Sequence, residues 1–368
     1  MRLASFNVEN LFSRARAMNQ ETWAEGKVIL NEFSKLNKLL QSANYTPAIK
    51  TKILDSLEVL NLLNSDESKF VLLRQNRGHL IKRPASGPVI VANGRGDWIG
   101  WLELKTEAVN ELATRMTAKV IGEVNADVLA VIEAEDRVAL RHFHDQLLKP
   151  GGITYRGIML IDGNDERGID VGLFTKQGFE VQTIVSHVDD AKDGKTIFSR
   201  DCAEYLVQVS PTKRLLLLVN HFKSKGFGSP AESNARRKAQ AQRVKEIYDQ
   251  RRAEGVDLIA VVGDLNDTPG SDPLKPLIAN TNLKDIFEHP EFDDGGRPGT
   301  FGNSTASNKI DYLLLSPELF ARVTAGHVFR KGIWGGVNGT LFPHFDEMTA
   351  AIHAASDHAA IVADIDLT

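Results

Sequence analysis

The stretch Leu258–Asp267, LIAVVGDLND, is the starting point for predicting the fold. Five apolar residues in a row are typical of a strand that is buried on both faces, and Gly263 interrupts the run before Asp264, Asn266 and Asp267. A buried strand that ends this way places carboxylates and an amide at the edge of a sheet. A single end of this kind is commonly a hydrogen-bonded turn, so a site is predicted only if other strands end in the same way.

Five other strand-like segments carry polar residues at one end. They are Leu3–Phe6 before Asn7, Val128–Ile132 before Glu133, Leu215–Val219 before Asn220 and His221, Tyr312–Leu315 after Asp311, and Ala359–Leu367 after Ser356, Asp357 and His358. Several such ends are harder to explain as unrelated turns. We therefore predict that they meet at one edge of a sheet core.

Helical patterns alternate with these strands. They cover Thr106–Val124, Arg137–Leu148 and Ala231–Arg252, which favours an α/β fold with a two-layer sheet core covered by helices. The region from Arg14 to Trp101 interrupts this order. It has helical patterns at Lys27–Gln41 and Pro47–Leu63, a strand-like Phe70–Leu73 and a connection rich in glycine and proline, so we interpret it as an insertion.

The bulk composition is that of an ordinary globular protein, with 368 residues, 42% hydrophobic residues and a net charge of -4. Two zones are locally basic. Lys69–Gly96 carries six lysines and arginines and no acid, and Thr212–Lys245 carries nine against Glu232 alone. Positive fields of this kind suit a phosphate-bearing partner, although a charge run is often only a solvated face.

The sequence gives no sign of a membrane segment or of a disulfide. The single cysteine, Cys202, excludes an intrachain disulfide, and no apolar run approaches the roughly 18 residues of a membrane span. The chain opens with a strand pattern rather than a signal peptide. We therefore expect a cytoplasmic protein as written, and secretion after removal of a signal stays open. No obligate protein partner is evident.

The polar residue types point to one kind of chemistry. Glu133, Asp357 and Asn7 offer hard oxygen ligands, and no CxxC or HExxH motif is present, so Mg²⁺ or Mn²⁺ is favoured over zinc. Such a metal can neutralise a phosphate oxygen, while histidines and aspartates align or deprotonate a water. No glycine-rich loop ends in GK[ST], which argues against nucleotide-driven phosphoryl transfer.

Seven motifs in order, SFNVENLF, DVLAVIE, GIDVGLF, VNHFKSK, VVGDLND, KIDYLLLS and SDHAAI, resemble the endonuclease/exonuclease/phosphatase superfamily, the DNase I-like hydrolases, and more closely its bacterial nuclease-like branch. The resemblance implies a four-layer α/β-sandwich, two packed mixed sheets flanked by helices. It implies one such domain over residues 1–368. Residues 14–101 match nothing in the family and are expected to form a mostly helical and loop insertion.

The resemblance also implies roles for individual residues. Glu133 is the expected main metal ligand, with Asn7 beside it on metal or phosphate, and Asp357 serves the metal or the leaving group. The expected catalytic residues are Asp170, His221, Asp264, Asn266, Asp311 and His358. Among them Asp264 and Asn266 position water and phosphate, and Asp311 orients His358. Whether Asp264 or His358 is the general base stays open.

His221 is expected to contact phosphate or assist proton transfer, with Asp170 as its orienting carboxylate. Lys223, Lys225 and Arg200 are the expected phosphate contacts outside the metal site. For the two lysines, a place in a solvated loop is an equally good interpretation.

The predicted activity is a divalent-metal-dependent phosphodiesterase acting on nucleic acid, a nuclease of low sequence specificity with DNA favoured over RNA. The alternative is a phosphoesterase for a small or lipid-head-group phosphate of the inositol phosphate or sphingomyelin type. A catalytically silent binding module is disfavoured because the expected site residues are present. For the insertion we expect a helical cap that restricts which nucleic acids enter, with a remote stabilising subdomain as the alternative.

Overall fold

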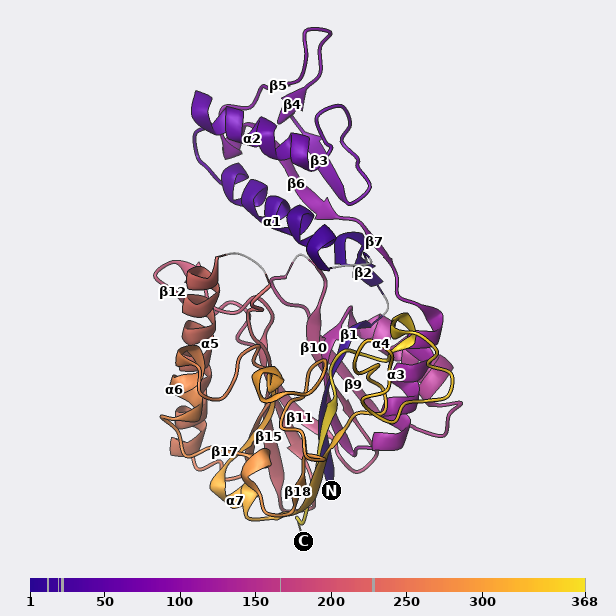
Figure 1. Cartoon of the computed structure of the whole chain (residues 1–368). Coiled ribbons are helices and arrows are strands. Elements are labelled where there is room, and N and C mark those ends of the chain that lie inside the picture. The colour runs from indigo at the N-terminus through magenta and orange to yellow at the C-terminus, as the bar shows by residue number, and fades with distance from the viewer. Residues whose placement is uncertain (12, 19, 21–22, 166, 227–228, 368) are drawn as a thin grey trace. The chain divides into compact units, whose positions relative to one another are not determined.

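The structure of the protein is a computed structural model that describes residues 1–11, 13–18, 20, 23–165, 167–226 and 229–367 (Figure 1). The chain divides into two compact units. The first comprises Met1–Phe12, Val109–Lys225 and Pro230–Thr368, and the second is built around Ser13–Ala108. Each unit has its own apolar core. The inserted segment expected at 14–101 has bounds close to those of the second unit.

The described residues of the first unit form two large mixed sheets. One sheet has the strand order β18 (Phe292–Asp293), β20 (Val323–Phe329), β21 (Ala360–Ile365), β1 (Arg2–Leu11), β8 (Val128–Ala134), β10 (Asp170–Thr175), β9 (Gly157–Ile161). The other has the order β11 (Val181–Val185), β14 (Cys202–Gln208), β15 (Arg214–His221), β16 (Ile259–Asp264), β19 (Asp311–Leu315), β17 (Lys284–Asp285). A short hairpin, β12 (Ala191–Lys192) and β13 (Lys195–Thr196), lies apart from both sheets in the hydrogen-bonding pattern.

The helices of this unit cover the outer faces of the sheets. They are α3 (Glu111–Val124), α4 (Arg137–Phe143, continued by a π-helical turn His144–Leu148), α5 (Pro230–Ala253) and α6 (Lys275–Ile278), whereas Leu319 of the short helix α7 (Pro317–Phe320) packs into the core between the sheets. Apolar residues of α3 and α4 pack on the sheet that contains β1. Those of α5 and α6 pack on the sheet that contains β16. A third core lies between the two sheets, so the unit is a four-layer α/β-sandwich and the fold prediction is confirmed.

Burial on both faces explains the uninterrupted apolar runs of the central strands. Along β16, Ala260 and Val262 lie in the core between the sheets, whereas Ile259 and Val261 lie in the core under α5 and α6. The side chains of a strand alternate between its two faces, and here both faces meet an apolar layer. Such strands cannot show an apolar–polar alternation, because either register would bury a polar side chain.

The second unit contains two helices and three small sheets among its described residues. They are α1 (Trp23–Leu40), α2 (Pro47–Val59) and the strand pairs β2 (Ser13–Ala15) with β7 (Thr106–Ala108), β3 (Val71–Arg77) with β6 (Ile99–Leu104), and β4 (Ile81–Lys82) with β5 (Val89–Ile90). Its core joins Leu36 of α1, Leu57 of α2, Leu73 of β3 and Leu102 of β6. The segment therefore has more strand than the sequence pattern indicates. Its strands are short and form isolated pairs, so most of them leave no clear pattern in the sequence.

The structure also differs from the sequence prediction at other elements. The helix expected over Thr106–Val124 begins only at Glu111, where Asn110 caps it by accepting from the N–H groups of Leu112 and Ala113. The three residues Thr106–Ala108 instead pair with β2. Strands β11 and β20 were not predicted, since both have mixed burial and lack an apolar run.

A buried ionic cluster lies at the sheet face that α5 covers. The carboxylate of Glu204, on β14, accepts hydrogen bonds from Arg251 Nε and Nη2 at 2.7 and 2.8 Å and lies 2.7 Å from His187 Nε2. Burial alone would raise the pKa of Glu204, but these contacts outweigh it and lower the pKa to about 2. The ionised carboxylate is therefore the form that the folded protein stabilises.

We expect Glu204→Gln to lower the free energy of unfolding by about 3 kcal/mol at pH 7 and by much less at pH 3. The folded pKa lies below the ordinary value of 4.5, so the contribution is complete above that value and is lost as the pH falls towards 2. Urea unfolding of both proteins at the two pH values measures this. The control is Glu254→Gln, which removes a half-exposed partner of the same Arg251 and should change little. An equal cost of Glu204→Gln at both pH values would contradict the assignment.

Candidate active site

Strand pairing brings the predicted polar residues to one edge of the sandwich. In one sheet, His221 is paired with Asp264 across β15 and β16, and Asp264 is paired with Asp311 across β16 and β19. In the other sheet, Asn7 is paired with Ile132, so Glu133 follows directly at the same end of β1 and β8. The pairing register therefore aligns residues that are far apart in the sequence.

Gly263 is required for this alignment. A Cβ atom at this position would lie 2.0 Å from the carbonyl oxygen of Asn220 on the neighbouring strand, and the residue has a φ of +123°. Any side chain would therefore push β15 and β16 apart and strain the backbone. The glycine that interrupts the apolar run thus allows His221 and Asp264 to stay adjacent.

Two of the predicted site residues have backbone conformations that are uncommon for residues with a side chain. Glu133 has a φ of +69° and Asn266 a φ of +55°. The pairing register of β1 with β8 also shifts beyond Asn7. Such local strain persists where surrounding contacts hold it and is commonly found at functional sites.

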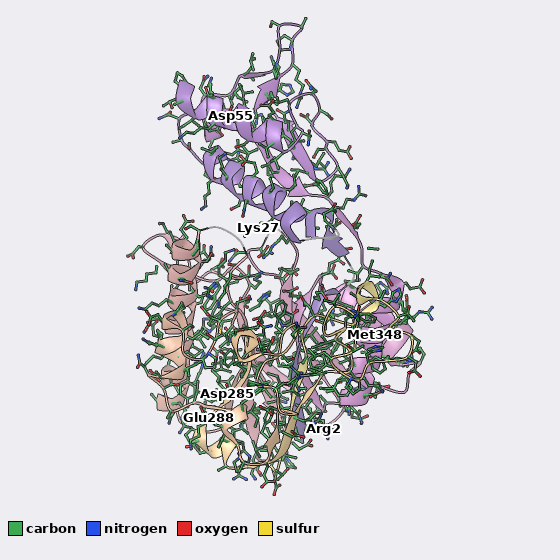
Figure 2. The ribbon with its side chains drawn as sticks, viewed as in Figure 1. Arg2, Lys27, Asp55, Asp285, Glu288 and Met348 are labelled. Atoms are coloured by element: carbon green, nitrogen blue, oxygen red, sulfur yellow. The ribbon has the colours of Figure 1, made fainter. Side chains whose placement is uncertain are left out.

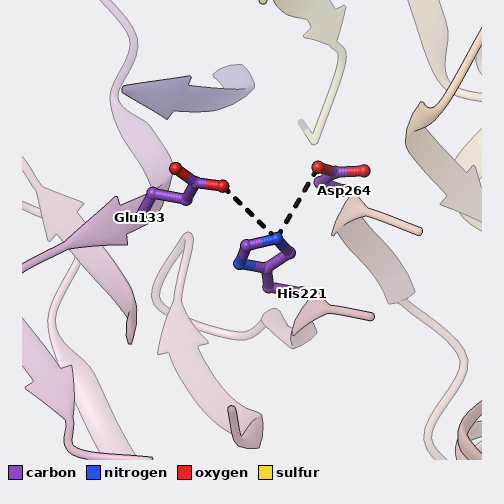
Figure 3. Close-up of side chains that lie close together, drawn as sticks. All are labelled: Glu133, His221 and Asp264. Atoms are coloured by element: carbon purple, nitrogen blue, oxygen red, sulfur yellow. Dashed lines mark ion pairs between the residues drawn. The ribbon is translucent and has the colours of Figure 1, made fainter. Parts of the chain in front are cut away.

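The centre of the site is formed by Glu133, His221 and Asp264, as Figure 3 shows. The Nε2 atom of His221 lies 3.4 Å from Glu133 Oε1 and 3.7 Å from Asp264 Oδ2. Asn7, which is 1% exposed, links the two sheets, because its Nδ2 group lies 3.3 Å from both Glu133 Oε1 and Asp264 Oδ2. Its Oδ1 atom accepts from the N–H of Glu9.

Asp264 is held in place by Asn266. The backbone N–H of Asn266 donates to Asp264 Oδ1 at 2.7 Å, and its Nδ2 group donates to Asp264 Oδ2 and to the carbonyl of Phe222. Burial and then the nearby charge of Asp311 raise the pKa of Asp264 to about 8. The carboxylate can therefore take up a proton near neutral pH.

Asp311 and His358 form a buried hydrogen-bonded pair. Asp311 Oδ2 lies 2.9 Å from His358 Nδ1 and accepts a hydrogen bond from Thr300 Oγ1 at 2.6 Å. Burial opposes the charged imidazolium, but the charge and hydrogen bond of Asp311 outweigh it and hold the pKa of His358 well above its ordinary value. His358 Nε2 lies 4.0 Å from Asp264 Oδ2. A cationic imidazolium thus faces the catalytic centre.

Asp311 is also supported from behind. Lys309 Nζ forms a buried ion pair with Asp285 Oδ2 at 2.9 Å and donates to the backbone carbonyl of Asp311 at 2.8 Å. Asp285 is labelled in Figure 2. This contact fixes the start of β19, where the carboxylate that orients His358 is located.

His221 is in a different electrostatic environment from His358. Burial and the charges of Arg200 and Arg167 lower the pKa of His221 well below its ordinary value. Its Nδ1 atom has no hydrogen-bond partner among the described residues. The expected hydrogen bond between His221 and the carboxylate of Asp170 is not found among the described residues, and Asp170 Oδ1 instead accepts from the N–H of Gly163 at 2.7 Å. Burial is the main cause that raises the pKa of Asp170 to about 7.

A buried cationic cluster lies near the centre. Asp165 accepts two hydrogen bonds from Arg167, at 2.8 and 2.7 Å, and lies 3.1 Å from Arg200 Nε. Arg200 is 1% exposed and donates to the carbonyl of Phe222. One carboxylate faces two guanidinium groups here, so the cluster keeps a net positive charge that suits a phosphate oxygen.

The two lysines expected to bind phosphate have different surroundings. Burial, followed by the charges of Arg167 and Arg200, lowers the pKa of Lys223 to about 7. Lys225 is half exposed and forms an ion pair with Asp267 at 2.6 Å. Lys223 is therefore in the cationic part of the site, whereas Lys225 is already paired.

The SDH segment, Ser356–His358, is hydrogen-bonded to residues near the start of the chain. Ser356 Oγ donates to the carbonyl of Asn7 at 2.7 Å and accepts from the N–H of His358. The N–H of Asp357 donates to Glu9 Oε2 at 3.0 Å, and Asp357 Oδ1 lies 3.6 Å from His358 Nε2. Sequence reasoning missed Glu9 and placed Ser356 at the sheet edge without assigning it a role, although both belong to motifs that it used.

Among the described residues, two groups of side chains could hold a divalent cation: Glu133 with His221 and Asp264, and Asp264 with Asp311 and His358. Within each group the potential ligand atoms lie within 4.8 Å of one another. The first group is the better candidate, because the charged His358 of the second group has no free nitrogen lone pair to offer. Carboxylate oxygens fit Mg²⁺ or Mn²⁺.

The two groups alter the predicted ligand set in one respect. Glu133 belongs to one of them, and His221 and Asp264 are further candidates. Asn7 turns its amide N–H towards the carboxylates, so ligation through its oxygen requires the amide to be flipped. Asp357 is in neither group found among the described residues, and its role as a ligand stays a prediction.

A cluster of acids, an amide and histidines at the edge of a four-layer α/β-sandwich is typical of a hydrolase of phosphate esters. A sequence model of the Endonuclease/Exonuclease/phosphatase family matches residues 93–319, which is more than half of the chain. The chain belongs to this family, and the sequence-based resemblance is confirmed. Enzymes of this family are divalent-metal-dependent phosphoesterases, and this protein is one of them.

Solved structures show the same fold. A mannosyl-6-phosphatase from Bacteroides thetaiotaomicron has a TM-score of 0.53 at 14% identity, over 69% of this chain and 91% of that chain. An endonuclease/exonuclease/phosphatase family protein from the same organism has a TM-score of 0.51 at 16% identity, over 68% and 87%. The human Nocturnin catalytic domain has a TM-score of 0.50 at 15% identity, over 71% and 89%. A comparison with curated protein sequences finds no match.

We expect Glu133→Gln to remove most metal-dependent phosphoesterase activity and to leave the fold intact. The substitution keeps the size of the side chain but deletes a negative charge from the candidate ligand group. Hydrolysis of bis(p-nitrophenyl) phosphate across a titration of Mg²⁺ and Mn²⁺ measures it, with circular dichroism as the check on folding. Near-normal turnover at saturating metal would overturn the assignment of Glu133.

We expect His358→Ala and Asp311→Ala each to reduce turnover severely, and the double variant to be little worse than the worse single one. The two side chains are joined by a 2.9 Å hydrogen bond, and residues that act as a unit are not additive in their effects. The measurement is turnover of the same substrate for all four proteins. Fully multiplicative losses would show that the two residues act independently.

Proposed function

We propose that the protein is a divalent-metal-dependent phosphodiesterase that hydrolyses nucleic acid with little sequence preference, DNA being favoured over RNA. The observation that carries the proposal is the arrangement of Asn7, Glu133, His221 and Asp264 at one sheet edge, with the charged His358 beside it. This arrangement supplies carboxylates for a cation and cations for a phosphate within one buried site.

Glu133 would hold Mg²⁺ or Mn²⁺ with His221 nearby, and Asp264, 3.7 Å from His221 Nε2, is left to act as a base. When bound, such a cation neutralises phosphate charge and stabilises the leaving oxygen. Asn7 positions the two carboxylates through its Nδ2 group and can contact a phosphate oxygen. Arg200 adds positive charge from the buried cluster with Asp165 and favours the same anionic group.

The charge states favour Asp264 over His358 as the base. A carboxyl group with a pKa of about 8 titrates close to neutral pH, which suits it to take a proton from water. His358 already carries its proton because Asp311 stabilises the imidazolium. Its Nε2–H can therefore stabilise the phosphate or protonate the leaving oxygen.

Support for a nucleic-acid substrate comes from the basic zones, and the two zones differ. In the zone Thr212–Lys245 many cations are paired with acids of the same unit, including Lys225 and Arg237 with Asp267, and Arg243 with Asp190. This zone therefore offers fewer phosphate contacts than its composition indicates. In the zone Lys69–Gly96, Arg74 and Arg83 are also paired with acids, but Arg77 and Lys82 are exposed and no ion pair of either is found among the described residues.

The second candidate function is hydrolysis of a small or lipid-head-group phosphate. The protein shares its fold with a mannosyl-6-phosphatase, whose name shows that this architecture also serves a small phosphate ester. The pairing of cations in the second basic zone fits this alternative as well. A substrate panel of plasmid, linear duplex, single-stranded DNA, RNA and phosphomonoesters distinguishes the two functions.

We expect hydrolysis of DNA to lose efficiency steeply between 50 and 200 mM salt, whereas hydrolysis of bis(p-nitrophenyl) phosphate changes little. A polyanion that is contacted at several phosphates displaces counterions, and a small diester does not. The measurement is kcat/KM for both substrates with Mg²⁺ or Mn²⁺. A flat profile for DNA, or turnover of phosphomonoesters alone, would favour the small-substrate function.

The double variant Lys223→Ala, Lys225→Ala extends this measurement. It should reduce the salt slope for DNA by roughly one to two units if both lysines contact phosphates. The matched control is the double variant Arg214→Ala, Lys284→Ala. Arg214 is at the start of β15 and Lys284 pairs with the last residue of β19, so both lie at strand ends opposite to the site. Equal slopes in the two double variants would assign Lys223 and Lys225 to the loop structure only.

A further inference from the structure

Strands β3 and β6 of the second unit have one covered face and one open face. Val71, Leu73 and Leu102 point into the core that α1 and α2 complete. The intervening residues are on the opposite face, which no described residue of this core covers. In Figure 1 the two strands lie side by side in the second unit. The open face, called the β3–β6 face below, is made of Leu72, Arg74, Arg77, Ile99, Trp101 and Glu103.

A bulge determines which side chains this face carries. Arg74 is paired with Trp101 and Gln75 with Gly100, but the next pair is Arg77 with Ile99, so Asn76 has no opposite residue. Without the bulge, Arg77 would point to the core side. The extra residue returns it to the open face, so two arginines stand directly opposite an aromatic and an aliphatic side chain.

The apolar members of the face are exposed. Trp101 is 44% and Ile99 51% exposed, and they lie two residues apart on one side of β6. Gly100 between them cannot carry a side chain, because a Cβ atom would lie 2.0 Å from the carbonyl oxygen of Arg74 and 2.4 Å from the ring of Trp98. The absence of a side chain at Gly100 therefore allows β3 and the ring of Trp98 to pack closely against β6.

Trp101 is held in a defined orientation. Glu103 accepts a hydrogen bond from the indole Nε1–H of Trp101 at 2.6 Å through Oε1 and one from Arg74 Nε at 3.0 Å through Oε2. One carboxylate therefore fixes both the ring and the adjacent guanidinium. A ring that is fixed before binding loses little conformational entropy when a flat ligand stacks on it.

The positive charge of the segment around the β3–β6 face indicates which class of ligand the face binds. Residues 69–96, which include β3, contain six lysines and arginines and no acid. On the face itself Glu103 is paired with Arg74, and no ion pair of Arg77 is found among the described residues. An exposed aromatic ring beside a cation fits a polyanion with flat groups better than it fits an apolar protein surface.

We propose that the β3–β6 face binds single-stranded nucleic acid, with a base stacked on Trp101 and a phosphate at Arg77. Single strands are favoured over duplex because the bases of a duplex already stack on each other. The face binds without reading sequence, since every base has an aromatic face. The choice of nucleic acid rests on the proposed function, but the binding itself needs neither metal nor turnover.

The test is binding of a fluorescein-labelled single-stranded DNA 20-mer to the full chain in EDTA, measured by fluorescence anisotropy. Trp101→Ala should weaken binding about 10-fold, whereas Trp101→Phe, which keeps an aromatic face, should largely restore it. Arg77→Ala should weaken binding and reduce the slope of log Kd against log salt by about 0.7. An unlabelled duplex of the same length should compete poorly.

Lys52→Ala is the matched control for charge, because Lys52 is exposed on α2, which packs on the other face of the strands. It should bind like the unmodified protein. Thermal melting by circular dichroism checks that the Trp101 variants are folded. Unchanged DNA binding by folded Trp101→Ala overturns the proposal. So does self-association of the unmodified protein that Trp101→Ala abolishes, because the face would then bind a second copy.

Hydrolysis of bis(p-nitrophenyl) phosphate by the same variants separates this proposal from the proposed function. The β3–β6 variants should hydrolyse the small diester at the unmodified rate. If the protein binds the 20-mer through Trp101 but never cleaves DNA, the nuclease function fails and the binding face stands. If it cleaves DNA but Trp101→Ala binds and cleaves normally, the binding face fails and the nuclease function stands.

Discussion

The backbone pairing of β15, β16 and β19 is the constraint on which the catalytic centre depends. It places His221, Asp264 and Asp311 in one row across three strands. Asp264 sits in the middle, buried, with acids on two sides, and amide donors and the imidazolium of His358 only partly offset the rise in its pKa. A slip of one residue in this register would turn the whole row into the apolar cores. The same register that packs the sandwich therefore also assembles the site.

Much of this arrangement could be predicted because of how the central strands are buried. Strands covered on both faces, such as β8 and β16, must be apolar throughout, so a polar residue at their ends is conspicuous in the sequence. Glu133 and Asp264 were found in this way. Edge strands such as β11 do not produce that signal, since exposed positions of VQTIV tolerate polar residues. In the second unit the strand-like Phe70–Leu73 is part of β3, whereas the other short strands were missed for the same reason.

The contacts within the site were less predictable, because they depend on local backbone geometry. The sequence suggested Asp170 as the partner of His221, but the register of β10 with β8 shifts between Asp170 and Val171, and the carboxylate instead accepts from Gly163. Thr300 and Arg167 were missed because each acts through a turn or loop that brings it to a residue of the site. Motif order identifies which residues gather at a sheet edge, whereas bulges and loops decide which of them touch.

The position of β1 in its sheet has a consequence for the timing of activity. β1 lies between β8 and β21, and Ser356 and Asp357, just before β21, bond to Asn7 and Glu9. During synthesis on a ribosome, the edge of β1 that pairs with β21 stays uncovered until a segment about 350 residues later has been made. A growing chain therefore lacks His358 and the clamp on Asn7 until the segment before β21 has been made. We therefore expect a chain that ends before Ser356 to carry most of the candidate ligand residues but not a closed site.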